Sequence, residues 1–387
     1  MINNKKKETV FVGMSGGVDS SVSVAMLKEQ GYDVVGVFIK TWHPDFLVCN
    51  EEEERLDAIR VATHLNIPFL TFDFEDVYKK EVADYMIQEY KEGRTPNPDV
   101  MCNKYVKFGA FLEKAISMGA DYVATGHYAQ IKSESSFLNG LAKIGTRRTE
   151  DLRKRSFHFL FTKGADPSKD QSYFLWTLKQ EQLLKILFPV GHLKKIEVRK
   201  LAKKFKIPVA LKKDSQGICF LGQVDLKDFL KHYIKEKKGK VLDENENEIG
   251  YHEGVIFYTL GERHGFVITE KSSNDGAYYV VGKDVKKNIL YVSQDKNFLK
   301  PSHGEQKNLC IKLKDINWIS EIFKVEKKYT AQIRYHGDFF SCKIKCLRQD
   351  LEQGRVEIIF EIPILVAPGQ SIVVYDKDIC IGGGVVI

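Results

Sequence analysis

Two cysteines stand in surroundings that could make their sulfur atoms chemically active. Cys102 ends the string Gly-Arg-Thr-Pro-Asn-Pro-Asp-Val-Met-Cys, in which Asp99 precedes the thiol by three residues. Pro96 and Pro98 are expected to keep this segment out of a helix. Cys102 would then lie just before a helix that begins at Lys104, where the helix dipole favours the nucleophilic thiolate. The alternative is an inert cysteine packed in a buried loop.

Cys219 stands between Ile218 and Phe220, in the string Lys-Lys-Asp-Ser-Gln-Gly-Ile-Cys-Phe-Leu-Gly over residues 212–222. Most cysteines with such apolar neighbours simply pack in the core. The upstream lysines and the flanking glycines favour a flexible, electropositive approach to the thiol. Residue types alone leave both interpretations open.

A glycine-rich turn at residues 13–22, Gly-Met-Ser-Gly-Gly-Val-Asp-Ser-Ser-Val, could bind phosphate groups. Gly16 and Gly17 let the backbone turn tightly and approach a ligand. The hydroxyls of Ser15 and Ser20, with the N–H groups of a helix start, form an anion site. The Gly-Lys-Ser/Thr of a Walker A loop is absent, so ATP held in the kinase manner is not expected. An ordinary strand–helix turn is the alternative.

Composition limits the class of protein. The 387 residues, 43% hydrophobic and 29% charged, are typical of a globular chain of two or three domains. No apolar run approaches the ~20 residues of a membrane helix, and the basic start lacks a secretory pattern, so we expect a cytoplasmic protein without membrane contact. A net charge of +7 is compatible with a polyanionic partner. Seven cysteines without a CxxC pair predict neither a disulfide framework nor a metal site.

The elements that must position these residues follow from hydrophobic periodicity. Strands are expected at 9–14, 33–40, 69–74 and 122–125, and helices at 19–30, 51–66, 75–92 and 104–117. This alternation predicts an α/β domain with a parallel sheet, whose ligands lie beyond the carboxyl ends of the strands.

From residue 132 onward the sequence no longer shows this alternation of strands and helices. Residues 132–168 look irregular and basic, and 180–187 and 196–205 look helical. Beyond about residue 238 we expect strands at 254–259, 265–269, 277–281, 289–292, 329–334, 339–346, 356–362 and 371–375. These predict small, mostly β domains, including a C-terminal β-barrel. The expected domains are 1–223, 224–297 and 298–387.

Several strings together carry a resemblance to known proteins. The turn at 13–22 resembles the pyrophosphate loop of the ATP pyrophosphatase superfamily, whose members cleave ATP between the α and β phosphates and adenylate a substrate oxygen. With both cysteine segments, in order, occur Ala124-Thr-Gly-His-Tyr128, Lys169-Asp-Gln-Ser-Tyr-Phe174, Phe188-Pro-Val-Gly191, Thr259-Leu-Gly-Glu-Arg263 and Cys380-Ile-Gly-Gly-Gly384. Over essentially its whole length the chain resembles the tRNA-specific 2-thiouridylase family.

The resemblance implies a fold, a reaction and a set of residues. The first domain would be adenine nucleotide alpha-hydrolase-like and would bind ATP, with Mg²⁺ expected. The nucleotide contacts would be Gly13, Met14, Ser15, Gly16, Gly17, Val18, Asp19, Ser20, Ile39 and Gly126. Cys102 would be the nucleophile, Cys219 would carry the incoming sulfur as a persulfide, and Asp99 would act as acid–base or touch the target base. The tRNA contacts would be Asn97, Pro98, Asp99, His127, Lys169, Asp170, Gln171, Arg334, Tyr335 and Gln370.

The implied reaction is 2-thiolation of the wobble uridine in tRNA of the Lys, Glu and Gln type, with AMP and pyrophosphate as products. The implied partners are tRNA, not DNA, and a persulfide-carrying donor protein fed by a cysteine desulfurase. The segment between Gln130 and Lys169 is longer than is usual in the family. Its basic run at 147–155 would be either a solvated loop or an added tRNA backbone contact. Cys49 receives no role.

Two alternatives remain open at this point. One is a synthetase or ligase of the same superfamily that adenylates a small molecule, which would need neither Cys102 nor Cys219. The other is a tRNA-binding protein whose nucleotide loop is only structural. Release of AMP that depends on small amides, or tRNA binding without turnover, would distinguish them.

Overall fold

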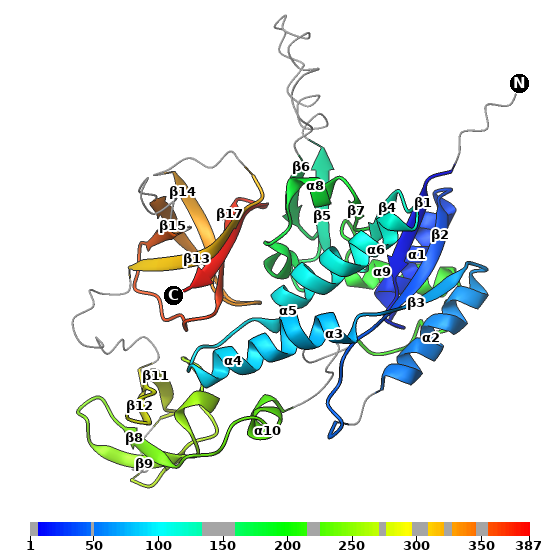
Figure 1. Ribbon diagram of the computed structural model, residues 1–387. Helices are drawn as coiled ribbons and strands as arrows, with labels where there is room; N and C mark the ends of the chain where they lie inside the picture. Colours follow the sequence, from blue (N-terminus) through cyan, green and yellow to red (C-terminus); the bar gives the residue numbers. More distant parts are fainter. Residues whose placement is uncertain are drawn as a thin grey trace, which may run out of the picture.

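The computed structural model describes residues 7–47, 50–133, 159–214, 225–270, 276–295, 309–320, 327–345 and 355–387. Within these ranges the strands form a five-stranded parallel sheet, a second five-stranded sheet and an eight-stranded antiparallel sheet (Figure 1). The predicted class, an α/β domain followed by small β domains with a C-terminal barrel, is confirmed. Cys49, Cys219 and the basic run at 147–155 lie outside the described residues.

The first sheet has the strand order β3-β2-β1-β4-β7, and all of its pairings are parallel. The strands are β1 (Thr9–Gly13), β2 (Asp33–Lys40), β3 (Phe69–Asp73), β4 (Tyr122–Ala124) and β7 (Ile186–Leu187). The helix expected at 180–187 is wrong in its second half. Helix α8 covers only Gln180–Leu183, and the chain then adds β7 to the sheet because residues 186 and 187 pair with β4.

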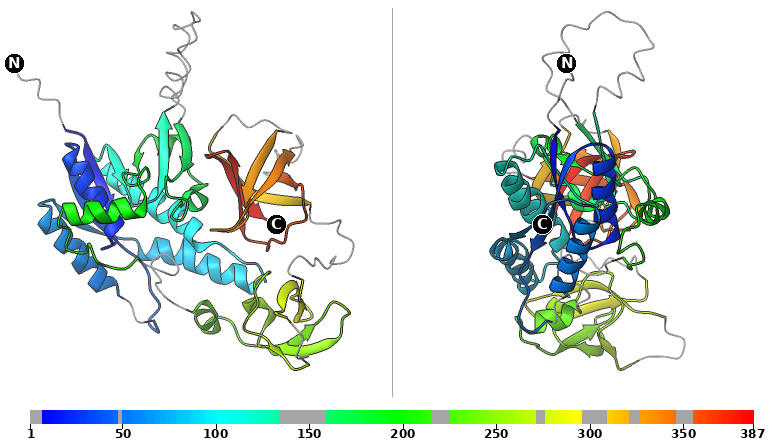
Figure 2. Two further views of the ribbon diagram at one scale, coloured as in Figure 1. Left: turned by 180° about the vertical axis from the view of Figure 1, so that it is seen from behind. Right: turned by 90° about the vertical axis from the view of Figure 1, so that its right-hand side faces the viewer.

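Both faces of this sheet are covered by helices (Figure 2). Val10 and Val12 of β1 pack with α1 (Val18–Glu29) and α9 (Lys195–Lys204), whereas Phe11 between them packs in the other cluster. The cluster that contains Phe11 also includes two long helical segments. Helix α2 (Glu51–His64) belongs to the cluster of Val10 and Val12, on the opposite face of the sheet. The long segments are α3 (Glu75–Tyr78), η1 (Lys79–Asp84) and α4 (Tyr85–Lys91), then α5 (Pro98–Met101), η2 (Cys102–Ala110) and α6 (Phe111–Ser117).

The helix that contains Cys102 begins earlier than predicted. It starts at Pro98, and the Asn97 side chain caps it by accepting a hydrogen bond from the Val100 amide at 3.2 Å. Proline is well tolerated at the first helical position, where its missing N–H has no partner to lose. The prediction that the prolines keep the segment non-helical up to Lys104 is therefore wrong. Cys102 lies one turn inside the helix, at the start of a π-helical stretch.

The second sheet has the order β10-β9-β8-β12-β11 and follows the short helix α10 (Leu226–Lys231). Its strands are β8 (Gly239–Leu242), β9 (Glu248–His252), β10 (Val267–Ile268), β11 (Tyr279–Asp284) and β12 (Ile289–Ser293). The strand expected at 254–259 is instead a 3₁₀ turn at Val255–Phe257.

Six strands of the third sheet close into a barrel, because β13 pairs with both β16 and β18. They are β13 (Cys310–Trp318), β14 (Lys328–Gln332), β15 (Phe339–Lys345), β16 (Val356–Phe360), β17 (Ser371–Asp376) and β18 (Ile379–Val386). The hairpin β5 (Ala129–Ser133) and β6 (Phe159–Lys163) extends this sheet, since Thr162 pairs with Ile379. A segment expected to be irregular thus joins the first domain to the barrel.

Thr95 lies where all three sheet-containing parts meet. Its amide donates to Pro368 O at 2.7 Å, and its carbonyl accepts from the Gln370 side chain at 2.9 Å. Its hydroxyl lies 3.3 Å from that of Thr259 in the central part. These contacts fix the chain immediately before the helix of Asp99 and Cys102.

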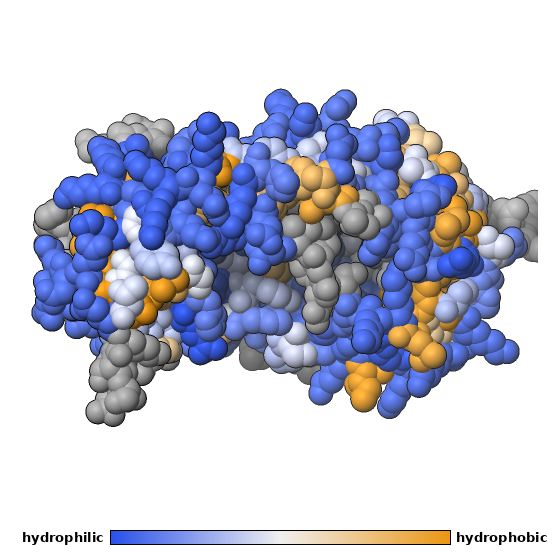
Figure 3. Space-filling model, turned by 90° about the horizontal axis from the view of Figure 1, so that it is seen from below, coloured by the Kyte–Doolittle hydropathy of each residue, from blue (hydrophilic) through white to orange (hydrophobic). Residues whose placement is uncertain are grey.

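One face of the molecule, seen from below, is mostly hydrophilic, with separate hydrophobic patches (Figure 3). Among the described residues, the helices are too short or too polar to cross a bilayer.

Replacing Ile358 of β16 with alanine should lower the free energy of unfolding by about 2–5 kcal/mol, because this side chain is fully buried in the barrel and its loss leaves a cavity. The matched control is Ile362→Ala, just beyond β16, where the residue is 54% exposed and a change within ~0.5 kcal/mol is expected. Denaturant unfolding measures both. Equal losses would contradict a closed barrel core.

Candidate functional site

The glycine-rich turn forms a tight loop between β1 and α1. Gly16 has φ +67°, and a Cβ there would lie 2.3 Å from the Glu54 carbonyl oxygen, so only glycine fits. Gly17 is the N-cap residue of α1, so this helix end has no side-chain cap from its N-cap residue. Ser20 lies in the first turn of α1, with its hydroxyl 3.2 Å from Gly17 O and 3.4 Å from the Ser15 amide. The loop presents amides and hydroxyls at a helix N-terminus, which is an arrangement that binds phosphate.

The other expected nucleotide residues lie at the same edge of the sheet. Ile39 is near the end of β2, and its side chain is 3.8 Å from where a Gly13 Cβ would be. Gly126, just after β4, lies so close to the loop that an added Cβ would be 2.7 Å from the Ser20 amide nitrogen. The structure therefore brings together residues 13–20, Ile39 and Gly126, and their contact with ATP stays a prediction.

Asp19 is held by two groups that the sequence did not single out. The Lys195 ammonium lies 2.7 and 2.8 Å from its two carboxylate oxygens, and the Tyr128 hydroxyl donates to it at 2.7 Å. Burial of Tyr128, together with the negative charge of Asp19, raises the pKa of the phenol well above its usual value. Tyr128 thus stays protonated and remains a donor to Asp19.

Asp214 shares the same ammonium. Lys195 lies 2.8 Å from Asp214, Lys169 lies 2.7 Å from it, and Arg199 lies 2.5 Å from it. Burial opposes ionisation of this carboxyl, but the hydrogen bonds and charges of Lys169 and Lys195 outweigh burial and lower its pKa to about 2. Asp214 is the last described residue before the segment that contains Cys219.

Asp99 and Cys102 lie three residues apart on one helix and therefore share a face. The Cys102 residue is fully buried, whereas Asp99 is partly exposed. Further along this helix, Phe111 lies 3.7 Å from the position of a Gly13 Cβ, so the helix runs past the nucleotide loop. Cys219, the other expected catalytic cysteine, lies outside the described residues.

His127 lies inside the molecule, where it is only 7% exposed. Its Nδ1 lies 2.7 Å from the Thr125 hydroxyl, and its Nε2 lies 3.5 Å from the Lys107 ammonium. Burial, and then the charge of Lys107, lowers the pKa of His127 well below its usual value, so the ring is neutral. In this position the imidazole contacts Thr125 and Lys107 and exposes little surface to a partner.

The segment 169–171 makes mainly internal contacts. Lys169 pairs with Asp214, and the Gln171 side chain accepts a hydrogen bond from the Tyr128 amide at 3.0 Å. Asp170 accepts from the Gly164 and Ser172 amides at 2.9 and 3.1 Å, but its burial raises the pKa of the carboxyl.

The barrel contributes residues beside the Cys102 helix. Arg334 is exposed at the β14–β15 turn, and the Tyr335 ring packs 4.3 Å from Phe174. Burial raises the pKa of Tyr335 to about 12, and the charges of Asp170 and Asp99 add to this effect. The Phe174 carbonyl in turn accepts a hydrogen bond from the Asn103 side chain at 3.3 Å, so Tyr335 lies beside the helix of Asp99 and Cys102, although it comes from a different domain. Gln370 bonds to Thr95, as described above.

The sequence analysis gave no role to Lys195, Arg199, Tyr128 or Thr95, although Tyr128 and Thr95 stand within the strings that carry the resemblance. Lys195 stands in the string Leu-Lys-Lys-Ile-Glu-Val-Arg, whose mixture of charges is typical of a solvated helix. Its side chain is only 14% exposed, a placement that depends on contacts with residues far away in the chain.

The fold and the loop define an α/β nucleotide-binding protein. A family profile described as "tRNA methyl transferase HUP domain" matches residues 8–223. Profiles described as "tRNA methyl transferase PRC-barrel domain" and "Aminomethyltransferase beta-barrel domain" match residues 227–294 and 308–386. A tRNA-specific 2-thiouridylase of Geobacillus thermodenitrificans is 44% identical over 394 aligned residues, which cover 100% of this chain and 96% of the relative.

Similar proteins of the same name from Listeria monocytogenes and Streptococcus thermophilus are 44% and 41% identical, each covering 100% of this chain and 96% of the relative. The chain belongs to the tRNA-specific 2-thiouridylase family. A solved 4-thiouridine synthetase–RNA complex with ATP covers 58% of this chain and 50% of its own, at 16% identity and a TM-score of 0.33. That likeness is too weak to support an argument.

Asp214→Asn should make the free energy of unfolding depend less on pH in the acid range. A carboxyl whose pKa is lower in the folded state stabilises the fold above its unfolded pKa of 3.8, and this contribution is lost as the pH falls toward about 2. The wild type should therefore lose stability over that window, and the variant should lose less. The control is Asp228→Asn on the exposed side of α10. Identical pH profiles for Asp214→Asn and wild type would contradict the ion-pair cluster.

Proposed function

We propose that this protein is a tRNA-uridine 2-sulfurtransferase. It adenylates the C2 oxygen of the wobble uridine with ATP and then replaces the activated oxygen with sulfur from a persulfide. The products are 2-thiouridine, AMP and pyrophosphate. The proposal rests on family membership, and the relatives carry the name tRNA-specific 2-thiouridylase.

The observation that carries the proposal is the course of the helix from Pro98 to Ser117. One part of it contacts the nucleotide loop, through Phe111 beside Gly13. An earlier part carries Asp99 and the Cys102 thiol and contacts Phe174, on which Tyr335 of the barrel packs. A uridine bound near Asp99 and Tyr335 could therefore meet ATP and a thiol at one edge of the sheet.

The chemistry needs two thiols with separate roles. The uridine C2 oxygen attacks the α-phosphate of ATP, and pyrophosphate leaves. A persulfide on Cys219 then supplies sulfur to C2, and AMP leaves with the original oxygen. Cys102 attacks the sulfur chain or resolves it after transfer, closing a transient disulfide with Cys219. Asp99 manages the proton, as a positioned carboxylate can.

Within the loop, the α1 amides, Ser15 and Ser20 would hold the phosphates, and Gly126 leaves room for close approach. Mg²⁺ would accompany ATP, bound largely by phosphate oxygens, as this ion usually is. No cluster of three or more His, Cys, Asp or Glu side chains suited to a metal occurs in the described part of the chain. Asn97 to Asp99, Arg334, Tyr335 and Gln370 are proposed tRNA contacts. The sulfur donor would be a persulfide-carrying protein supplied by a cysteine desulfurase.

The direct test is mass analysis of tRNA nucleosides after incubation with ATP and a persulfide donor. Formation of 2-thiouridine that requires both reagents is the expected result. AMP release that depends on small amides and not on tRNA would instead indicate a small-molecule ligase. Binding of tRNA without turnover would indicate a binding protein.

Ser20→Ala should lower tRNA-dependent AMP formation by about 100-fold or more, because it removes a hydroxyl from the phosphate loop. Ser23→Ala is the matched control: this buried hydroxyl lies one turn further along α1 and donates to Asp19 O at 2.9 Å. Pyrophosphate release measures both. Equal activities of the two variants would exclude a role for Ser20 at the phosphates.

Cys219→Ser and Cys102→Ser should each abolish 2-thiouridine formation while the proteins still bind ATP and tRNA. The reason is that persulfide transfer requires both sulfur atoms. Cys310→Ser is the control, since Cys310 lies exposed at the start of β13. Nucleoside mass analysis is the readout. Thiolation by Cys219→Ser with a protein sulfur donor would contradict the two-thiol scheme.

A further inference from the structure

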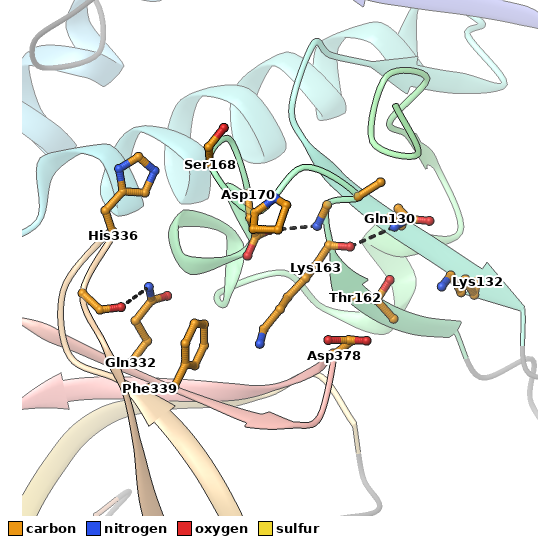
Figure 4. A pocket seen from close by; sticks show the side chains of 14 residues that line it. Gln130, Lys132, Thr162, Lys163, Ser168, Asp170, Gln332, His336, Phe339 and Asp378 are labelled. Atoms are coloured by element: carbon orange, nitrogen blue, oxygen red, sulfur yellow. Dashed lines mark hydrogen bonds between the residues drawn. The ribbon is translucent and has the colours of Figure 1, made fainter. Parts of the chain in front are cut away.

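A cavity of about 630 Å³ lies between the β6 end of the hairpin and the β14–β15 turn of the barrel (Figure 4). Its walls include Lys132 and Lys163 from the hairpin, Ser168 from the following loop, and His336 and Phe339 from the barrel. Ligand pockets range from roughly 300 to 1,000 Å³, so the space is sufficient for one nucleotide.

Lys163 is the distinctive residue of this cavity. Its ammonium lies 3.8 Å from the centre of the Phe339 ring and 4.8 Å from that of Tyr375. Among the described residues, no carboxylate forms an ion pair with it. Burial lowers the pKa of Lys163, against the charges of Asp378 and Asp170. A partly desolvated cation without a paired anion favours the binding of an anionic ligand beside it.

Two acids, Asp170 and Asp378, also line the cavity. Asp170 accepts hydrogen bonds from the Gly164 and Ser172 amides and the Ser172 hydroxyl, and its burial raises the pKa of the carboxyl. Asp378 contacts Lys163 through the backbone, where the Lys163 amide donates to its carbonyl at 2.9 Å. Neither acid neutralises the Lys163 ammonium by direct contact, so the cation is available to a ligand.

The opposite wall carries aromatic surface. Phe339 is 42% exposed, although it is a large apolar side chain. His336 is exposed with φ +55°, and its ring stacks 4.0 Å from Tyr335. Aromatic faces beside a cation are the combination that binds single nucleotides of an RNA strand, through stacking and a phosphate contact.

The position of the cavity identifies the RNA. His336 directly follows Arg334 and Tyr335, which are proposed tRNA contacts, and Ser168 and Asp170 lie on the facing wall of the cavity. We propose that this cavity binds one further nucleotide of the tRNA, away from the reacting uridine, with its phosphate on Lys163 and its base against Phe339 and His336. The inference rests on the proposed function.

The first experiment replaces Lys163 with methionine, which keeps the aliphatic stem and removes the charge, and with arginine, which keeps the charge. Lys163→Met should weaken tRNA binding by on the order of 10-fold and reduce the slope of log affinity against log salt by about one, because one fewer counterion is released. Lys163→Arg should retain the slope. Lys312→Met, on an exposed position of β13, is the control and should change neither quantity.

The second experiment locates the phosphate. Single neutral methylphosphonate linkages are placed along the tRNA, and affinity is measured for wild type and Lys163→Met. At one position the neutral linkage should weaken wild-type binding and have no further effect on the variant, because both changes remove the same contact. Additive losses at every position would overturn the proposal, as would an unchanged salt slope for Lys163→Met. Thermal unfolding and the KM for ATP should be unchanged in the variant.

These results are separable from those that test the reaction. Wild-type protein that makes 2-thiouridine, with Lys163→Met binding tRNA as wild type does, would overturn the cavity proposal alone. Wild-type protein that neither binds tRNA nor forms 2-thiouridine would overturn the proposed function, and the cavity proposal with it.

Discussion

A single ammonium group, that of Lys195, lies between the carboxylates of Asp19 and Asp214. Two carboxylates this close would repel each other without a cation between them, and one would be driven to protonate. Asp19 belongs to the nucleotide loop, and Asp214 leads into the segment of Cys219. One charge therefore links the glycine-rich turn to the residue that precedes the segment of Cys219. Tyr128, Lys169 and Arg199 extend this cluster and connect it to the β4–β5 loop, the 166–171 loop and α9.

The thiol of Cys102 is positioned by its helix and by the apolar side chains around it. It lies within a capped helix, buried among apolar side chains and beside a partly exposed carboxylate. Burial shields a sulfur atom from solvent oxidants, which act on accessible thiolates. A helical frame also sets the direction of the side chain more narrowly than a loop does. The π-helical stretch that begins at Cys102 is of the kind often found at functional sites in proteins.

The parts of the fold that could be predicted from the sequence are those governed by local patterns. The four strands expected in the first 130 residues and the helices between them follow from periodicity, and their order follows from the rules for parallel sheets. The phosphate loop follows from Gly16, Gly17 and the serines. Other features depend on long-range contacts. β7 is a strand only because β4 offers an edge, and the β5–β6 hairpin gains its place by pairing with β18. Pro98 was misread because proline both ends helices and begins them.

The hydrogen bond between Thr95 and Gln370 joins residues 275 positions apart. During synthesis, the parallel sheet and its phosphate loop can assemble long before the ribosome reaches the barrel strands. The segment ahead of Cys102 acquires its last restraint only when residues 368–370 arrive and dock. In a nascent chain the glycine-rich turn can thus be formed while the Cys102 helix is still incompletely positioned. The order of translation thereby makes the final positioning of this helix wait for the barrel domain.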